Sequence, residues 1–169
     1  MGKLVDVLKR ISDILEKFVG YICMVLVAVM LTVVMVQVTL RAARASVPWS
    51  EELSRMLLIW IGMLGAGIAA KNGLHVGVDF LITVLPRKLS QILSILIKGT
   101  LVWFLFFFAK YSLQAAEGAL RVKATTIEIT MYFPKLALPV GSVLILIHII
   151  YLLAAEIQDL FPRAGKEAL

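Results

Sequence analysis

Four long apolar stretches, separated by short charged segments, set the pattern of this chain. They cover residues 19–40, 53–70, 92–109 and 136–155, and the segments between them carry almost all of the charge. A helix of about 20 residues crosses the roughly 30 Å hydrocarbon core of a bilayer and bonds its own backbone polar groups, for which lipid offers no partner. The pattern predicts an all-α integral membrane protein with four transmembrane helices in a single membrane domain, residues 1–169.

The segment before the first apolar stretch, residues 1–18, predicts a further helix. Apolar residues recur at spacings of three and four from Leu4 to Phe18, and charged residues take the other faces. This pattern is typical of an N-terminal amphipathic helix that lies in the membrane interface before the chain turns into the bilayer. The alternative is a helical extension of the first span. A cleaved targeting segment is not expected, because acidic residues interrupt the basic region and the apolar stretch is too long.

Composition and charge fit this class. Hydrophobic residues make up 61% of the chain and charged residues 17%, against about 45–50% and about 25% in soluble domains. The net charge of +6 is explained by membrane topology, so no nucleic-acid partner is expected. Four spans place both termini on one side, with nine Lys and Arg residues there and five opposite. The nine are Lys3, Lys9, Arg10, Lys17, Lys71, Arg87, Lys88, Arg163 and Lys166, and the five are Arg41, Arg44, Arg121, Lys123 and Lys135. The positive-inside bias predicts cytoplasmic termini.

The sequence contains no recognisable catalytic or cofactor motif. It has no HExxH, GxSxG, phosphate-binding glycine loop or Cys/His cluster, so we expect neither an enzyme nor a bound cofactor or metal. All eleven acidic residues lie outside the apolar stretches or at their ends. That argues against a proton-coupled exporter, which needs an acid at mid-membrane, but leaves open a sodium site made of backbone carbonyls. The lone Cys23 is expected to pack inside the first span.

Three polar residues in or near the spans allow more than one interpretation. His148, in the fourth span, and His75, after the second, suggest either a haem ligand pair or, for His148, a hydrogen bond between helices or to a partner. Lys98 lies deep in the third span, and no acid is expected at its depth. It either extends its long side chain to a lipid phosphate or faces a polar group on another membrane subunit.

The linker between the first two spans concentrates charge and an interfacial aromatic residue. Ser50 is a candidate N-cap, and Glu51 and Glu52 then lie in the first helical turn, four and three residues before Arg55. Trp49 is expected at the membrane interface. The segment is either a well-started helix or, together with Arg41, a contact with another subunit. Further along, Gly62, Ala66 and Ala70, with Gly65 and Ala69 on an adjoining row, predict one closely packed side of the second helix.

These residues resemble the small membrane subunit of TRAP (tripartite ATP-independent periplasmic) transporters, and most closely those of sialic acid systems. The resemblance covers residues 10–160 and rests on a combination of positions together with two further spans. The positions are Arg41, Pro48-Trp49-Ser50-Glu51-Glu52, Arg55, Trp60, Gly65, Lys71, His75-Val76 and Val78-Asp79.

The resemblance implies a sodium-coupled importer of organic anions, such as sialic acid or C4-dicarboxylates, in the bacterial inner membrane. The small subunit would act as a scaffold and membrane anchor for a large, elevator-type membrane subunit, and a periplasmic substrate-binding protein would deliver the substrate. Other interpretations are a haem or quinone anchor of a respiratory complex and a small homodimeric exporter. Expected contacts with partners or with membrane lipids are Arg41, Trp49, Glu51, Glu52, Arg55, Trp60, Lys98, Arg121 and Lys123.

The connection over residues 112–131 is a candidate docking segment for the substrate-binding protein. Its first part can prolong the third helix, and the part from Leu120 to Thr130 alternates like an extended strand. Arg121, Lys123 and Glu128 would then contact the binding protein. A solvated connection without a partner is the alternative.

Overall fold

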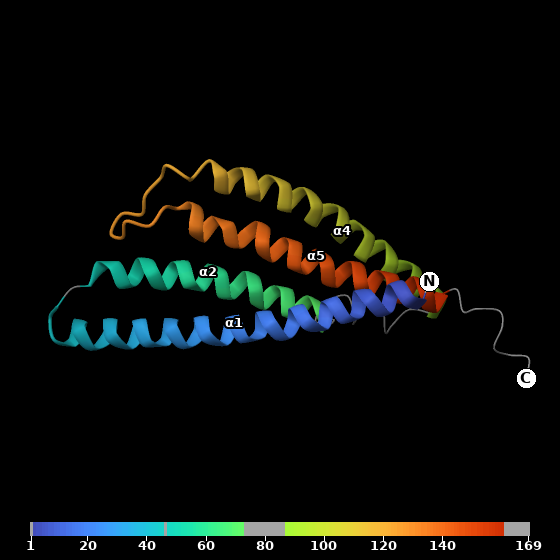
Figure 1. Cartoon of the computed structure of the whole chain (residues 1–169), viewed down its shortest axis with the longest axis horizontal. Helices are drawn as coiled ribbons and strands as arrows, with labels where there is room; N and C mark the ends of the chain where they lie inside the picture. Colours follow the sequence, from blue (N-terminus) through green and yellow to red (C-terminus); the bar gives the residue numbers. More distant parts are fainter. Residues whose placement is uncertain (1, 46, 73–86, 161–169) are drawn as a thin grey trace, which may run out of the picture.

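Long α-helices make up most of the chain in the computed structural model, which describes residues 2–45, 47–72 and 87–160. The helices are α1 (Gly2–Ala42), α2 (Pro48–Lys71), α4 (Arg87–Glu117) and α5 (Tyr132–Leu160), and each is long and apolar enough to cross a membrane (Figure 1). The predicted all-α membrane class is confirmed. His75, Asp79 and the expected cytoplasmic interface segment at residues 74–85 lie outside the described residues.

The first helix is continuous. The expected interfacial helix at residues 1–18 is not a separate element, because these residues form the beginning of the 41-residue helix α1 and no turn follows them. Gly20 near the expected break lowers helix stability by only about 1 kcal/mol and the segment contains no proline, so nothing in the sequence stops the helix there. At 1.5 Å per residue α1 is about 61 Å long, roughly twice the thickness of a hydrocarbon core.

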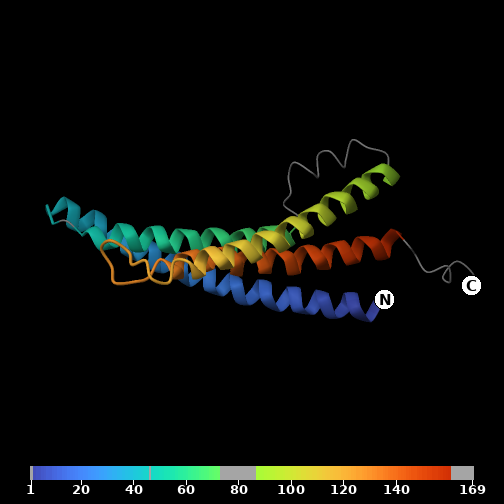
Figure 2. The ribbon, with the colours of Figure 1, turned by 90° about the horizontal axis from the view of Figure 1, so that it is seen from above.

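The helices form an open row in the order α1, α2, α5, α4 (Figures 1 and 2). In the described part of the chain α5 contacts the three other helices, whereas α4 contacts α5 and neither α1 nor α2. Of the most apolar stretch of α5, 39% is buried, against 6% for α1. α5 is therefore the centre of the fold. One end of the row, here the loop end, holds the α1–α2 turn and residues 118–131, and the opposite end, the terminal end, holds the start of α1 and the end of α5 (Figure 1).

Two glycines bring α2 and α5 into close contact. A Cβ at Gly141 would lie 2.7 Å from Cβ of Met63 and 3.1 Å from its carbonyl oxygen, and a Cβ at Gly67 would overlap the side chain of Leu144. Leu144 also forms the apolar core with Leu64 and with Val19 of α1. Small residues thus permit the backbone approach that packs helices without a hydrophobic driving force.

The closely packed side of α2 differs in part from the side that the sequence indicated. Ala70 of the expected row is buried, but Gly62 and Ala66 are exposed, and Gly67 makes the closest approach instead. The spacing identifies residues that share a face but not the face that meets a neighbour.

The start of α2 differs from the start that the sequence indicated. The second helix begins at Pro48, so the N-cap is Val47, which provides no side-chain cap. Ser50 is buried within the first turn, and its hydroxyl donates to the Val47 carbonyl at 2.7 Å. The expected Ser50 cap is wrong because the helix starts three residues earlier, at a proline, whose missing N–H needs no partner in the first turn.

Substituting alanine for Gly141 is expected to loosen the α2–α5 contact. The added methyl group overlaps the Met63 backbone, which cannot rotate away as a side chain can, so the free energy of unfolding should fall by about 1–3 kcal/mol. Unfolding of the purified chain in detergent measures this. Gly99→Ala is the matched control, because a Cβ there meets none of the described atoms within 4 Å. An equal loss for both variants would contradict close packing at Gly141.

Candidate functional site

A lysine at the end of α2 joins two helices near the terminal end. The Lys71 ammonium donates to Asp13 at 2.6 Å and to Glu16 at 2.5 Å, both on α1. Only 10% of the Lys71 side chain is exposed. A cation at the end of an apolar helix is costly unless paired, so this arrangement fixes the register of α1 against α2.

A buried hydrogen bond lies one residue away. Ser12 Oγ of α1 and His148 Nδ1 of α5 are 2.7 Å apart, and both residues are fully buried. Of the two interpretations of His148, the structure shows the hydrogen bond between helices. His148 Nε2 is also buried and has no partner among the described residues.

Lys98 has a partner within this chain, contrary to expectation. Its ammonium donates to Glu156 of α5 at 2.6 Å, and each side chain is 24% exposed. The expectation that no acid lies at this depth is wrong. The apolar stretch of the sequence ends at residue 155, but helix α5 continues to Leu160. Glu156 therefore lies on α5 itself, on the face that meets α4.

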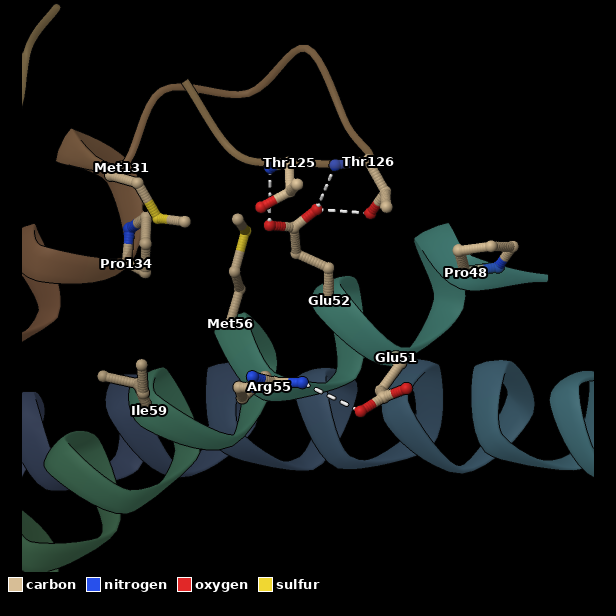
Figure 3. Close-up of a pocket in the computed structure, with 10 residues that line it drawn as sticks. All are labelled: Pro48, Glu51, Glu52, Arg55, Met56, Ile59, Thr125, Thr126, Met131 and Pro134. Atoms are coloured by element: carbon tan, nitrogen blue, oxygen red, sulfur yellow. Dashed lines mark hydrogen bonds and ion pairs between the residues drawn. The ribbon is translucent and has the colours of Figure 1, made fainter. Parts of the chain in front are cut away.

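At the loop end, the two acids of α2 have separate partners (Figure 3). Glu51 accepts from Arg55 at 2.9 Å, as its spacing of four predicts. Glu52 turns instead to the 118–131 loop, where its carboxylate accepts the backbone N–H groups of Thr125 at 2.9 Å and Thr126 at 2.8 Å, and the Thr126 hydroxyl. These charge-assisted bonds hold the loop over the start of α2.

The hydrogen bonds of Glu52 to Thr125 and Thr126 are called the Glu52 clamp below. A cavity of about 310 Å³ lies next to it, between α2, the loop and the start of α5 (Figure 3). Met56 and Ile59 form its floor, and Arg55 and both glutamates contribute charge. The expected extended strand from Leu120 to Thr130 is not formed. The chain turns at residues 118–121 and bends at residues 125–128, and an isolated antiparallel bridge between Lys123 and Thr130 joins the two sides of that bend.

The remaining expected contact residues are spread over the surface and the interior. Arg41, Arg121 and Lys123 are exposed, as is 43% of Trp49. Trp60 packs against Phe133 of α5 with ring centroids 5.6 Å apart, so it takes part in the packing of this chain. Four aromatic side chains of α4 are more than half exposed, which leaves them available to lipid or to another subunit: Trp103, Phe104, Phe106 and Tyr111.

Sequence reasoning missed the long-range partners. The signal available for the Lys71 contact was the spacing of three between Asp13 and Glu16, which places both carboxylates on one face of a helix. No comparable signal pointed to Thr125 and Thr126, since a loop backbone can meet a carboxylate in any sequence.

Removing one member of the Lys98–Glu156 pair is expected to cost more than removing both. Lys98→Met leaves a partly buried carboxylate unpaired and should lower the free energy of unfolding by about 1.5–3 kcal/mol, whereas adding Glu156→Gln should recover most of this loss. Unfolding in detergent is measured for Lys98→Met, for Glu156→Gln and for the double variant. Lys110→Met, which removes an exposed cation of α4, is the control. Strictly additive losses would show that the pair is not coupled.

Comparison with known proteins supplies the family. The family described as tripartite ATP-independent periplasmic transporters, DctQ component, matches residues 30–159. The sialic acid TRAP transporter small permease protein SiaQ of Vibrio cholerae is 33% identical over 97 residues, 56% of this chain and 55% of that protein. The C4-dicarboxylate TRAP transporter small permease protein DctQ of Rhodobacter capsulatus is 27% identical over 120 residues, 70% of this chain and 51% of that protein.

A third relative is much longer. The sialic acid TRAP transporter permease protein SiaT of Haemophilus influenzae is 26% identical over 121 residues, which are 72% of this chain but 19% of that protein. The chain thus spans about half the length of the two small permease relatives and a fifth of the long one. Because the family match extends from the middle of α1 to the end of α5, with four membrane-spanning helices in place, the chain belongs to the DctQ-component family of tripartite ATP-independent periplasmic transporters.

Proposed function

We propose that this chain is the small permease subunit of a sodium-coupled TRAP importer of organic anions and acts as a static scaffold for the large membrane subunit. The names of its relatives support sialic acid or a C4-dicarboxylate as substrate. SiaT supports a large partner, because the region similar to this chain is a small part of that longer permease. We further propose that the complex lies in the bacterial inner membrane with both termini of this chain in the cytoplasm, as its charge distribution favours.

The outward face of α2 is the observation that carries the proposal. Gly62 and Ala66 are exposed, and a Cβ at Gly62 meets none of the described atoms within 4 Å. α1 and α5 flank α2 in the open row, so none of the described helices covers this face. Small residues exposed one turn apart on a transmembrane helix are suited to close packing against another helix. We place a helix of the large subunit here.

The positions of the ion pairs support a stationary role. Lys71 and Lys98 are each held by acids of a neighbouring helix, and Glu52 is held by the loop. These contacts tie α1 to α2, α4 to α5, and the loop to α2. Charge in the described helices is thus used to fix elements relative to one another, as a scaffold beside a moving partner requires.

Filling the small-residue face is expected to weaken the complex. Gly62→Leu combined with Ala66→Leu keeps the helix apolar but prevents close approach, so recovery of the large subunit with the tagged chain should fall by about tenfold or more. Co-purification from detergent-solubilised membranes, with both subunits of the same transporter expressed together, measures this.

Gly20→Leu is the matched control, because a Cβ at Gly20 on α1 also meets none of the described atoms within 4 Å. It should leave recovery unchanged. Equal recovery with the Gly62→Leu/Ala66→Leu variant would refute this contact face. Sodium-driven uptake of an organic acid into liposomes that contain this chain alone would refute the scaffold role.

The loop at residues 118–131 is the proposed docking segment for the substrate-binding protein. Arg121, Lys123 and Glu128 are exposed, and the Glu52 clamp holds the backbone between them in place. A preorganised loop loses less conformational freedom on binding, which favours transient recognition of a partner by charge.

Charge reversal on this loop is expected to impair transport with the membrane complex intact. Arg121→Glu with Lys123→Glu should reduce binding-protein-dependent uptake by about fivefold or more, because like charges then face the partner. Uptake into liposomes that contain both membrane subunits measures it, with co-purification as the check on assembly. Lys110→Glu, an exposed residue of α4 outside the loop, is the control. Unchanged uptake would show that the loop is a simple solvated connection.

A further inference from the structure

A second cavity, of about 300 Å³, lies at the turn between α1 and α2. Its lining combines the last turns of α1 with the first turn of α2: Gln37, Arg41, Arg44, Ala45, Val47, Pro48 and Glu51. It is separate from the cavity beneath the loop, although Pro48 and Glu51 line both. A volume of this size accommodates a small ligand or the polar head of a larger one.

The cavity carries uncompensated positive charge. Arg41 and Arg44 both line it, and neither forms an ion pair with the described residues. The one acid in the lining is Glu51, whose carboxylate is bound to Arg55 at 2.9 Å. Two guanidinium groups beside an already neutralised carboxylate attract an anion, and their planar N–H donors suit phosphate oxygens in particular.

Arg44 adopts a backbone conformation that is unusual for its residue type. Its φ is 61°, and it ends α1 with its N–H donating to the Arg41 carbonyl at 3.0 Å while the Ala45 N–H donates to the Leu40 carbonyl at 2.9 Å. This is a Schellman motif, whose left-handed position is normally glycine. A side chain there is strained by about 1–2 kcal/mol. Such strain points to a role for the side chain that glycine could not fill.

The surroundings favour a lipid over a free anion. The cavity lies where the apolar stretch of α1 ends, and large apolar side chains just before it are exposed, among them Met35 at 67% and Val38 at 61%. Trp49, a residue type enriched at membrane interfaces, is also exposed beside it. A ligand with an anionic head at the arginines and acyl chains along α1 would satisfy both parts of this surface.

We propose that this cavity binds the phosphate of an anionic phospholipid, with Arg41 and Arg44 as the donors. The Gln37 side chain, one turn before Arg41, offers a further amide donor in the lining. Bound lipid fixes the exposed end of α1 at the depth of the headgroups. This lipid site is separate from the proposed contact of α2 with the large subunit.

Lipid selectivity tests the proposal directly. The purified full-length chain is mixed in detergent with equal amounts of phosphatidylglycerol and phosphatidylcholine, and bound lipid is measured by native mass spectrometry. The wild type should retain phosphatidylglycerol preferentially. Arg41→Gln and Arg44→Gln should each lower that preference by about fivefold, the effect expected of one basic residue at an anionic headgroup.

Two further variants separate charge from folding. Arg44→Gly removes the guanidinium and also relieves the backbone strain, so it should lose phosphatidylglycerol as Arg44→Gln does while unfolding at the same or a higher temperature. Lys110→Gln removes an exposed cation of α4 that does not line the cavity, and it should bind lipid like the wild type.

Four results would overturn the lipid site. The first is equal retention of both lipids by the wild type, and the second is an unchanged preference in Arg41→Gln and Arg44→Gln. The third is displacement of bound phosphatidylglycerol by millimolar inorganic phosphate, which would identify a site for free anions. Loss of bound lipid when the large subunit is present would equally overturn it, because the arginines would then face that partner.

Discussion

A charged side chain near the end of an apolar helix must find a partner. In this chain that requirement determines the rotation and register of the helices relative to one another. Lys71 closes α2 with only a tenth of its side chain exposed and is held by two acids of α1. The distance from Asp13 to Glu16 is less than one helical turn, so both acids can reach one ammonium only at one rotation of α1. That rotation also turns Ser12 toward His148 of α5. One ionic contact thus aligns three helices.

Apolar packing holds the helices together along the rest of their length. Gly67 and Gly141 let α2 and α5 approach closely, and Leu144 fills the space between α1, α2 and α5. The fourth helix of the row, α4, depends on α5 alone among the described helices, with Lys98 and Glu156 as its ionic contact. An open row of this kind keeps a large apolar surface for lipid and for other subunits. A closed four-helix bundle of the same length would have buried that surface within itself.

The sequence contained enough information for the helices but not for their rotation. Apolar length alone located all four, because a bilayer demands about 20 apolar residues whatever the packing. The rotation of each helix about its own axis could not be predicted from the sequence. α5 is apolar on every side, so no apolar stripe marks the face that meets its neighbours. Hence Gly67 rather than Gly62 proved to be the contact, and Glu156 was placed at a helix end rather than opposite Lys98. Glu51 and Arg55 were predictable because both members lie on one helix.

The length of α1 explains why its two halves need different supports. The half near the terminal end packs through Val19 and its neighbours and is held by the acids that bind Lys71. Beyond residue 27 its side chains are mostly exposed, so among the described residues the main support of that half is α2 and the turn that leads into it. A helix of about 61 Å held at one end amplifies a small tilt into a large displacement at the other. A scaffold therefore needs a second attachment at the far end, and the strained Arg44 beside Arg41 occupies the position where such an attachment is most effective.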